Sequence, residues 1–216
     1  MTVAPYNSGV SPMQASTHHH HQTRVLPKVF AGHSTRVYDL LARRLLRGFY
    51  RRIAEDVADA APDGGAVLDV GTGPGVLLTE IARRRADVRL TGIDLSADMV
   101  ATAQRNVAEL GERVSAQVAD VAGLPFPDDA FDLVVTSLSL HHWDDVESAV
   151  AELARVLRPG GRLYVYDFPA APFSDVVATA DARGLFTGGA SRRTTIRTGV
   201  LFPRRCVRHV MYAAGG

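Results

Sequence analysis

The sequence predicts an α/β fold built around a mostly parallel β-sheet. Short apolar runs of strand length alternate with longer segments of helical periodicity, an order typical of such sheets. The first strand candidate, residues 66–70, carries one acid in an otherwise apolar run and leads directly into three alternating glycines. The chain has 216 residues, of which 46% are hydrophobic, so one domain with a sizeable core is expected.

The glycines are the most informative local feature. Gly71, Gly73 and Gly75 have the spacing G-x-G-x-G, which differs from the G-x-G-x-x-G of nicotinamide and flavin binders. Because glycine has no Cβ, a ligand can approach the backbone of such a turn closely. The helix expected over 76–85 would present its N-terminal N–H groups at the same place. Asp69 lies two residues before the first glycine, where it could pair with a cationic group.

This combination resembles motif I of the class I S-adenosylmethionine (SAM) methyltransferases. The resemblance covers about residues 63–168, and further motifs of the family follow there in order. The stretch 123–132 is similar to the subfamily that includes ubiquinone and menaquinone methyltransferases and many small-molecule methyltransferases, and Arg158-Pro-Gly-Gly is another family motif. The resemblance implies a Rossmann-like, doubly wound, mostly parallel seven-stranded sheet, SAM-dependent methyltransferase activity and SAM as the cofactor.

The remaining elements are expected from periodicity and composition. Strands are expected over 66–70, 89–94, 114–118, 133–137, 163–168, 194–202 and 206–212, the last two forming the antiparallel edge that the resemblance implies. Helices are expected over 76–85, 97–110, 145–157 and 174–185. An arginine-rich amphipathic helix over 34–60 is expected to pack on the sheet and to cover the cofactor as a lid.

We expect a single domain after a flexible tail. Residues 1–33 are rich in Ser, Thr, Pro and His and are expected to be disordered. Residues 34–216 are expected to form one SAM-dependent methyltransferase domain. Within it, 34–60 would be the lid helix, 63–168 the SAM-binding core, and 169–216 the C-terminal helix and edge strands.

Several residues are candidate cofactor ligands. Asp94 lies 23 residues after Gly71, close to the interval of about 20 residues at which a second-strand acid reaches a ribose; capping the next helix is the alternative, but Ser96 is better placed for it. Met99 would pack on an adenine face or fill the core. The resemblance assigns Asp120 to the adenine amino group and the next backbone N–H to a ring nitrogen. The complete set is Asp69, Gly71, Thr72, Gly73, Gly75, Asp94, Leu95, Met99, Asp120, Val121 and Ser137.

His141 and His142 follow the strand expected over 133–137, at the carboxyl end of the sheet where open α/β folds bind ligands. A neutral imidazole suits a general base, although a structural hydrogen bond is an equal alternative. The resemblance favours His142. Asp144 or Asp145 could orient the base, but capping of the following helix is favoured. A Mg²⁺ site built from His141 and these two aspartates is required by neither the spacing nor the resemblance, so no metal is expected.

The acceptor is expected to be the hydroxyl oxygen of a small molecule, such as a sugar, a polyketide or a phenol. The segment 137–143 lacks the Asn/Asp-Pro-Pro-aromatic motif of base N-methyltransferases. Cys206 lies far in sequence from the motif loops, which disfavours pyrimidine C5 methylation. Carbon methylation of a quinone precursor is the alternative reaction, and a catalytically silent SAM-binding module is the alternative of another class.

Charge and composition limit the expected partners. The formal net charge is only +1, yet seven arginines and no acid follow Asp181. An anionic partner, RNA or a phosphorylated acceptor, is one interpretation; a solvated surface is favoured because no nucleic-acid-binding motif accompanies the arginines. No apolar run approaches about 20 residues, so no membrane span is expected. The single cysteine and the lack of a signal pattern predict a cytoplasmic protein.

Overall fold

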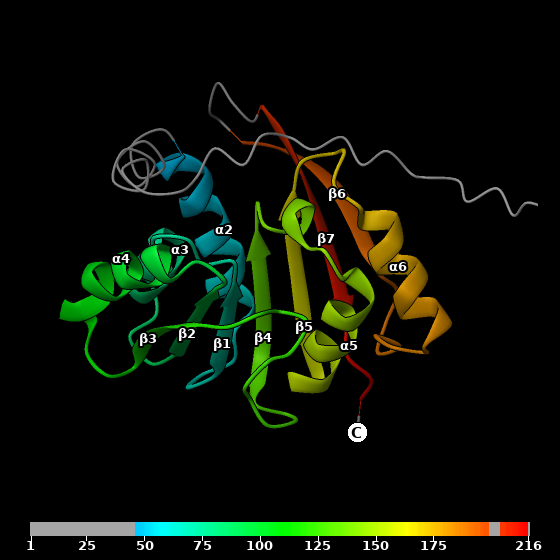
Figure 1. Cartoon of the computed structure of the whole chain (residues 1–216), viewed down its shortest axis with the longest axis horizontal. Coiled ribbons are helices and arrows are strands. Elements are labelled where there is room, and N and C mark those ends of the chain that lie inside the picture. Colours follow the sequence, from blue (N-terminus) through cyan, green and yellow to red (C-terminus); the bar gives the residue numbers. More distant parts are fainter. Residues whose placement is uncertain (1–45, 199–203, 216) are drawn as a thin grey trace, which may run out of the picture. The chain divides into compact units, whose positions relative to one another are not determined.

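Seven strands form one sheet in the order β3-β2-β1-β4-β5-β7-β6 (Figure 1). Strands β1 to β5 pair in parallel along this order, and β7 pairs antiparallel with both β5 and β6. The expected mostly parallel, seven-stranded sheet with an antiparallel edge is therefore confirmed. The strands are β1 Ala66–Val70, β2 Arg89–Asp94, β3 Val114–Val118, β4 Phe131–Ser137, β5 Leu157–Asp167, β6 Arg192–Arg197 and β7 Arg205–Tyr212.

The computed structural model describes residues 46–198 and 204–215, all of which belong to a unit that runs from Gly32 to Gly216. The tail expected over 1–33 and the first part of the helix expected over 34–60 lie outside the described residues. Among the described residues, none of the helices has the length and apolar character needed to cross a membrane.

Helices cover both faces of the sheet (Figure 1). Buried residues of α2, α3 and α4 form one hydrophobic cluster with one face of the strands, and those of α5 and α6 form a second cluster with the opposite face. The doubly wound arrangement follows from this division. The helices are α2 Arg47–Ala60, α3 Val76–Ala82, α4 Ala97–Val107, α5 Val146–Val156 and α6 Phe173–Ala182, with 3₁₀ turns at Ala108–Leu110 and Leu140–His142.

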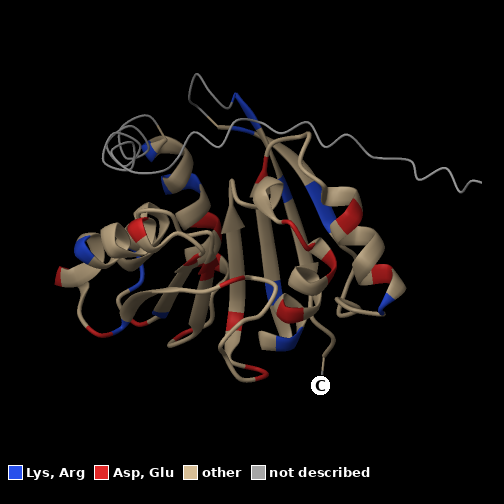
Figure 2. Ribbon diagram, viewed as in Figure 1, with Lys and Arg blue, Asp and Glu red and all other residues tan. Residues whose placement is uncertain are grey.

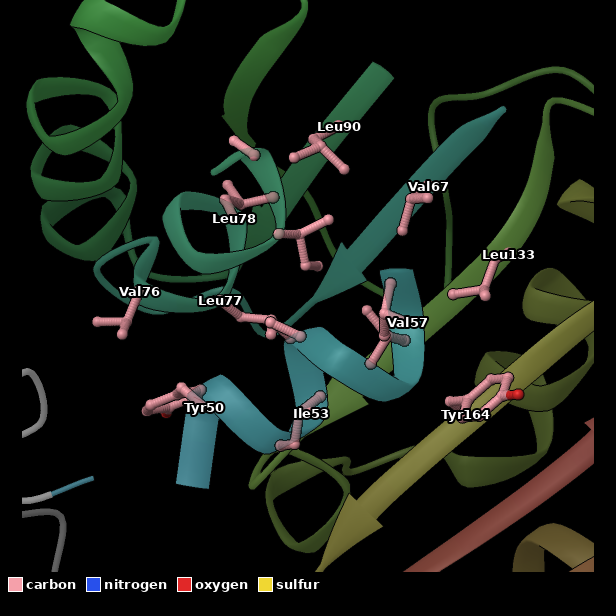
Figure 3. Packing of buried hydrophobic residues seen from close by; sticks show 14 of the residues in the cluster. Tyr50, Ile53, Val57, Val67, Val76, Leu77, Leu78, Leu90, Leu133 and Tyr164 are labelled. Carbon is pink, nitrogen blue, oxygen red and sulfur yellow. The ribbon is translucent and has the colours of Figure 1, made fainter. Parts of the chain in front are cut away.

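Helix α2 is the described part of the helix expected over 34–60. Its residues Phe49, Ile53 and Val57 recur every four positions and are fully buried, as the helical period requires. Figure 3 shows Ile53 and Val57 packed toward α3 and the strands. This end of the helix therefore rests on the sheet.

The element boundaries differ from expectation mainly in β5, which begins at Leu157 instead of 163. Leu157 pairs with Phe131, and the register shifts before Leu133 pairs with Arg162. The Arg158-Pro-Gly-Gly motif therefore lies in an irregular start of the strand. Its proline and glycines favour a turn, and residues 158–161 form the irregularity between these two pairs, with Gly160 at φ 74°.

Candidate active site

The three glycines of the loop after β1 all have positive φ, but they face different surroundings. A Cβ on Gly71 would lie 2.2 Å from the Ser139 hydroxyl, and one on Gly75 would lie 3.1 Å from the Ala103 Cβ on α4. A Cβ on Gly73, with φ 53°, would meet nothing within 4 Å. Gly71 and Gly75 thus allow close packing of the protein on itself, and Gly73 leaves open space for a ligand.

Asp69 is fully buried on β1. Its Oδ2 accepts a hydrogen bond from the Thr72 hydroxyl at 2.7 Å, while Oδ1 has no partner among the described residues. Burial disfavours the charged carboxylate and raises the pKa of Asp69 to about 7. Thr72 is itself buried, so it supports this carboxylate from inside the loop. A cation beside Oδ1 would stabilise the charged form of Asp69.

Asp94, at the end of β2, holds the glycine loop. One oxygen accepts the backbone N–H of Gly73 and the other that of Ser96, each at 2.9 Å. Ser96 caps α4, as expected, by accepting the Met99 N–H. Each carboxylate oxygen of Asp94 keeps a lone pair for a further donor. A pair of hydroxyl groups next to Gly73 could therefore bind there.

Apolar side chains adjoin Asp94. Leu95 is 71% exposed. Val118 of β3, which pairs with Asp94 of β2, is 53% exposed. Met99 is half-buried on the first turn of α4. Large apolar groups exposed side by side suit contact with a flat apolar ligand.

The remaining cofactor candidates occupy two further places. Asp120 is exposed after β3, where its carboxylate accepts the Ala122 N–H at 2.9 Å and closes a turn. Val121 is half-buried and packs on the core cluster of α5 and α6. Ser137, the last residue of β4, is buried and pairs with Tyr166 of β5.

His141 forms a dyad with Asp167, the last residue of β5. The imidazole Nδ1 lies 2.8 Å from Oδ1 and 3.0 Å from Oδ2 of the carboxylate. The Asp167 side chain is fully buried and also accepts the backbone N–H groups of His141 and Phe168. A carboxylate can only accept, so Nδ1 donates and Nε2 is left as the basic nitrogen. The sequence analysis missed Asp167, although an acid at the end of an apolar strand is the same signal that singled out Asp69.

His142 and Asp144, the other two catalytic candidates, form no side-chain hydrogen bond with another described residue. The His142 ring lies against that of His141, with centroids 4.0 Å apart, and burial together with His141 lowers its pKa. Asp144 is exposed and has no hydrogen-bond or ion-pair partner among the described residues. The structure therefore gives Asp144 no contact through which to orient either histidine, whereas Asp167 contacts His141. Asp145 caps α5 by accepting the Ser148 N–H at 2.9 Å, as favoured.

Neither the Mg²⁺ site considered from the sequence nor a hollow between α2 and α3 belongs to the candidate active site. Among the described residues, no group of three or more His, Cys, Asp or Glu is placed to hold a metal ion, so His141, Asp144 and Asp145 are not brought together. A hollow of about 190 Å³ is lined by one residue of α2, three of α3 and the C-cap of α3: Arg47, Val76, Thr79, Glu80 and Arg83. None of the candidate site residues lines it.

The arrangement fits SAM as a ligand. Asp69 offers an unpartnered buried carboxylate oxygen to the amino cation, and the open space at Gly73 admits the chain beside it. Asp94 offers acceptors for the ribose hydroxyls, and Leu95 offers an apolar surface for the adenine.

The strand order, the glycine loop after β1 and Asp94 at the end of β2 are those of one fold class. The fold is that of the class I SAM-dependent methyltransferases. Residues 68–165 match the family model described as a methyltransferase domain. The SAM-dependent methyltransferase from Aquifex aeolicus has this fold, with a TM-score of 0.65, 21% identity, and coverage of 84% of this chain and 97% of that chain. Residues 68–165 of this chain are therefore similar to a methyltransferase domain, and the chain has the fold of these enzymes.

Two curated relatives are similar in sequence. A demethylmenaquinone methyltransferase from Thermus thermophilus is 41% identical over 139 residues, 62% of this chain and 62% of the relative. A 27-O-demethylrifamycin SV methyltransferase from Amycolatopsis mediterranei is 38% identical over 125 residues, 56% of this chain and 46% of the relative. The chain thus spans less than two thirds of either relative. One of the two names states transfer to oxygen.

Proposed function

We propose that this protein transfers a methyl group from SAM to a hydroxyl oxygen of a small molecule, with His141 as the general base. The observation that carries the proposal is the His141–Asp167 dyad, whose Nδ1–Oδ1 distance is 2.8 Å. It lies at the carboxyl ends of β4 and β5, the edge of the sheet at which Asp94 ends β2. Ligands of open α/β sheets bind at this edge.

Bound SAM would supply an electrophilic methyl group on its sulfonium. On this chain, Asp94, Asp69 and Gly73 would fix the cofactor's position, leaving His141 to act on the acceptor. Nε2 would take the hydroxyl proton as the acceptor oxygen forms its new bond to carbon. Asp167 would stabilise the imidazolium that results and keep the ring in the orientation that exposes Nε2.

A second candidate is methylation of a carbon atom in a quinone precursor, favoured by the 41% identity to a demethylmenaquinone methyltransferase. The same base could serve it, because removing a phenol proton spreads negative charge onto ring carbons. The dyad alone does not select oxygen over carbon, so product analysis must.

The test uses the full chain with SAM labelled with carbon-13 in its methyl group. Titration calorimetry should detect binding of SAM and of S-adenosylhomocysteine, and no binding of NAD. Hydroxylated sugars, polyketides and phenols, together with a demethylated naphthoquinol, are then offered as acceptors. A methoxy signal in the product spectrum is expected. A carbon-bound methyl would establish the second candidate, and cofactor binding without transfer to any acceptor would favour a silent binding module.

A further inference from the structure

Two arginines lie at the same edge of the sheet as the dyad. Strand β6 runs in the direction of β5, because both pair antiparallel with β7. Arg197, which ends β6, therefore lies at the carboxyl-end edge, and Arg205, which begins β7, pairs directly with it. Figure 2 shows blue segments of β6 and β7 at this end of the hairpin.

The strand register relates this pair to the dyad. Val207 pairs with Asp167 on one side and with Thr195 on the other. Arg205 lies two residues before Val207 on the same strand, so their side chains project from the same face of the sheet. Diagonal neighbours of this kind are about 7–8 Å apart. Arg205 is thus the diagonal neighbour of Asp167, the carboxylate that holds His141.

The pairing of Arg197 with Arg205 is electrostatically unfavourable, because like charges directly opposite one another destabilise an antiparallel pair. Both side chains are exposed, and neither forms an ion pair or side-chain hydrogen bond with another described residue. Protection of a sheet edge by charge would account for Arg197 on the outer strand. It does not account for Arg205, because β7 is paired on both sides.

No acid among the described residues neutralises the pair, and few acids lie in the terminal parts of the sequence. No Asp or Glu follows Asp181, and residues 1–45 contain only Asp39. By contrast, Arg208 on the opposite face of β7 is paired with Asp56. A balancing anion for Arg197 and Arg205 is therefore expected to come from another molecule.

We propose that Arg197 and Arg205 form an anion subsite that binds a carboxylate or phosphate group of the methyl acceptor. The acceptor is then a hydroxylated acid, with its hydroxyl toward His141 and its anionic group toward the two guanidinium groups, which can bind either anion in a bidentate manner. The inference rests on the proposed function. The position beside the dyad favours a small acceptor over a nucleic acid, which would require a longer basic track.

The test compares acceptors that differ only in charge. The probes are 4-hydroxybenzoate, 4-hydroxyphenyl phosphate and methyl 4-hydroxybenzoate, with the hydroxycinnamate acid and methyl ester as longer counterparts. Binding to the full chain with S-adenosylhomocysteine is measured by calorimetry, and methylation is measured with labelled SAM. The variant carries Arg197→Gln and Arg205→Gln. Arg192→Gln is the matched control, because Arg192 is exposed at the other end of β6 and pairs with Val210.

We expect the wild type to bind at least one anionic probe more tightly than its neutral ester. The double variant should bind that probe about tenfold more weakly and the ester unchanged, while the control behaves as the wild type. The relative affinities of the carboxylate and the phosphate identify the anion. Removing two like charges should not lower the melting temperature, so a folded variant is expected.

Three results would overturn the subsite: no anionic probe binds better than its ester, the double variant loses acid and ester equally, or Arg192→Gln has the same effect. An RNA oligomer that binds through these arginines without competing with the acids would do so as well. If the enzyme methylates the neutral esters as well as the acids, the proposed methyl transfer is supported and the anion subsite is disproved. If the acids bind through Arg197 and Arg205 but are never methylated, the anion subsite is supported and the proposed methyl transfer to these acceptors is disproved.

Discussion

Two adjacent histidines follow β4, and only His141 contacts a carboxylate. Both belong to the 3₁₀ turn Leu140–His142 and their rings lie against each other, but only the ring of His141 reaches the end of β5. The Asp167 side chain is buried at the end of β5, and a buried charged group needs hydrogen-bond partners. It has three, and one of them is the imidazole that it orients.

Replacing His141 with Ala should lower turnover about 10²-fold or more, because the acceptor proton loses its base, while SAM affinity stays nearly unchanged. The matched change His142→Ala should have a much smaller effect. Steady-state kinetics with SAM titrations check both variants.

Near-parental turnover in the His141 variant would remove the general-base role. If His142 were the base instead, its variant would be the slow one. Burial and His141 lower the pKa of His142. If His142 were the base, turnover would therefore rise with pH at a pH below the ordinary imidazole pKa of about 6.5.

Asp69 should couple SAM binding to pH. The pKa of Asp69 is raised to about 7 by burial, whereas the cofactor's amino group would bind the charged carboxylate. SAM affinity in the wild type should therefore increase as the pH rises through 7. Asp69→Asn should bind SAM more weakly and lose this dependence. Calorimetry at several pH values checks it, and a wild-type affinity that is constant through pH 7 would contradict the assignment.

Asp94→Ala should weaken SAM binding more than tenfold, because hydrogen bonds to a charged group are worth about 1.5–3 kcal/mol each. The structure adds a second reason: the same carboxylate holds the Gly73 N–H. Gly73→Val should have at least as large an effect, since its side chain would enter the open space, and it leaves Asp94 in place. Parental affinity in Asp94→Ala would disprove the ribose role.

Much of this site could be predicted from local sequence, because a glycine loop and the acids that flank it belong to short contiguous motifs. Asp167 could not be assigned a partner in this way, since 26 residues separate it from His141. The choice between His141 and His142 depends on the turn geometry, which composition does not specify. Sequence spacing offered Asp144 or Asp145 as a possible partner, with capping favoured, and Asp144 is exposed in the structure.

At the scale of elements, α2 is fastened to the sheet by a polar cluster as well as by its apolar face. Asp56 accepts hydrogen bonds from the Tyr166 hydroxyl at 2.7 Å and from Arg208 at 2.9 Å. These partners lie on β5 and β7, more than a hundred residues along the chain. The helical period predicted the apolar face of α2, but no local pattern predicts so distant a polar contact.

Asp56→Ala should destabilise the protein by about 2–3 kcal/mol, because it leaves a buried hydroxyl and a half-buried guanidinium without an acceptor. The control is Glu55→Ala on the same helix. Glu55 is largely exposed and lies 3.5 Å from Arg84, so its loss should cost less than about 0.5 kcal/mol. Urea unfolding measures both. Equal effects would show that the cluster does not fasten the helix.

At the scale of the whole molecule, two buried groups on different strands oppose each other in their response to pH. His209 on β7 is 2% exposed, neither ring nitrogen has a partner among the described residues, and burial together with Arg193 lowers its pKa. Its contribution to stability is present above the unfolded value of about 6.5 and is lost as the pH falls. Asp69 has a raised pKa, so its contribution is present below about 3.8 and is lost as the pH rises toward 7.

As the pH falls below the unfolded histidine pKa of about 6.5, the two contributions should therefore partly cancel in the cofactor-free protein. His209→Phe keeps an aromatic ring against Phe173 and should make stability fall more steeply with rising pH. Asp69→Asn should make stability rise with pH, because only the contribution of His209 then changes over this range. The double variant should show the flattest profile in urea unfolding at successive pH values. Single variants whose slopes change in the same direction would show that one of the two groups keeps its ordinary pKa in the fold.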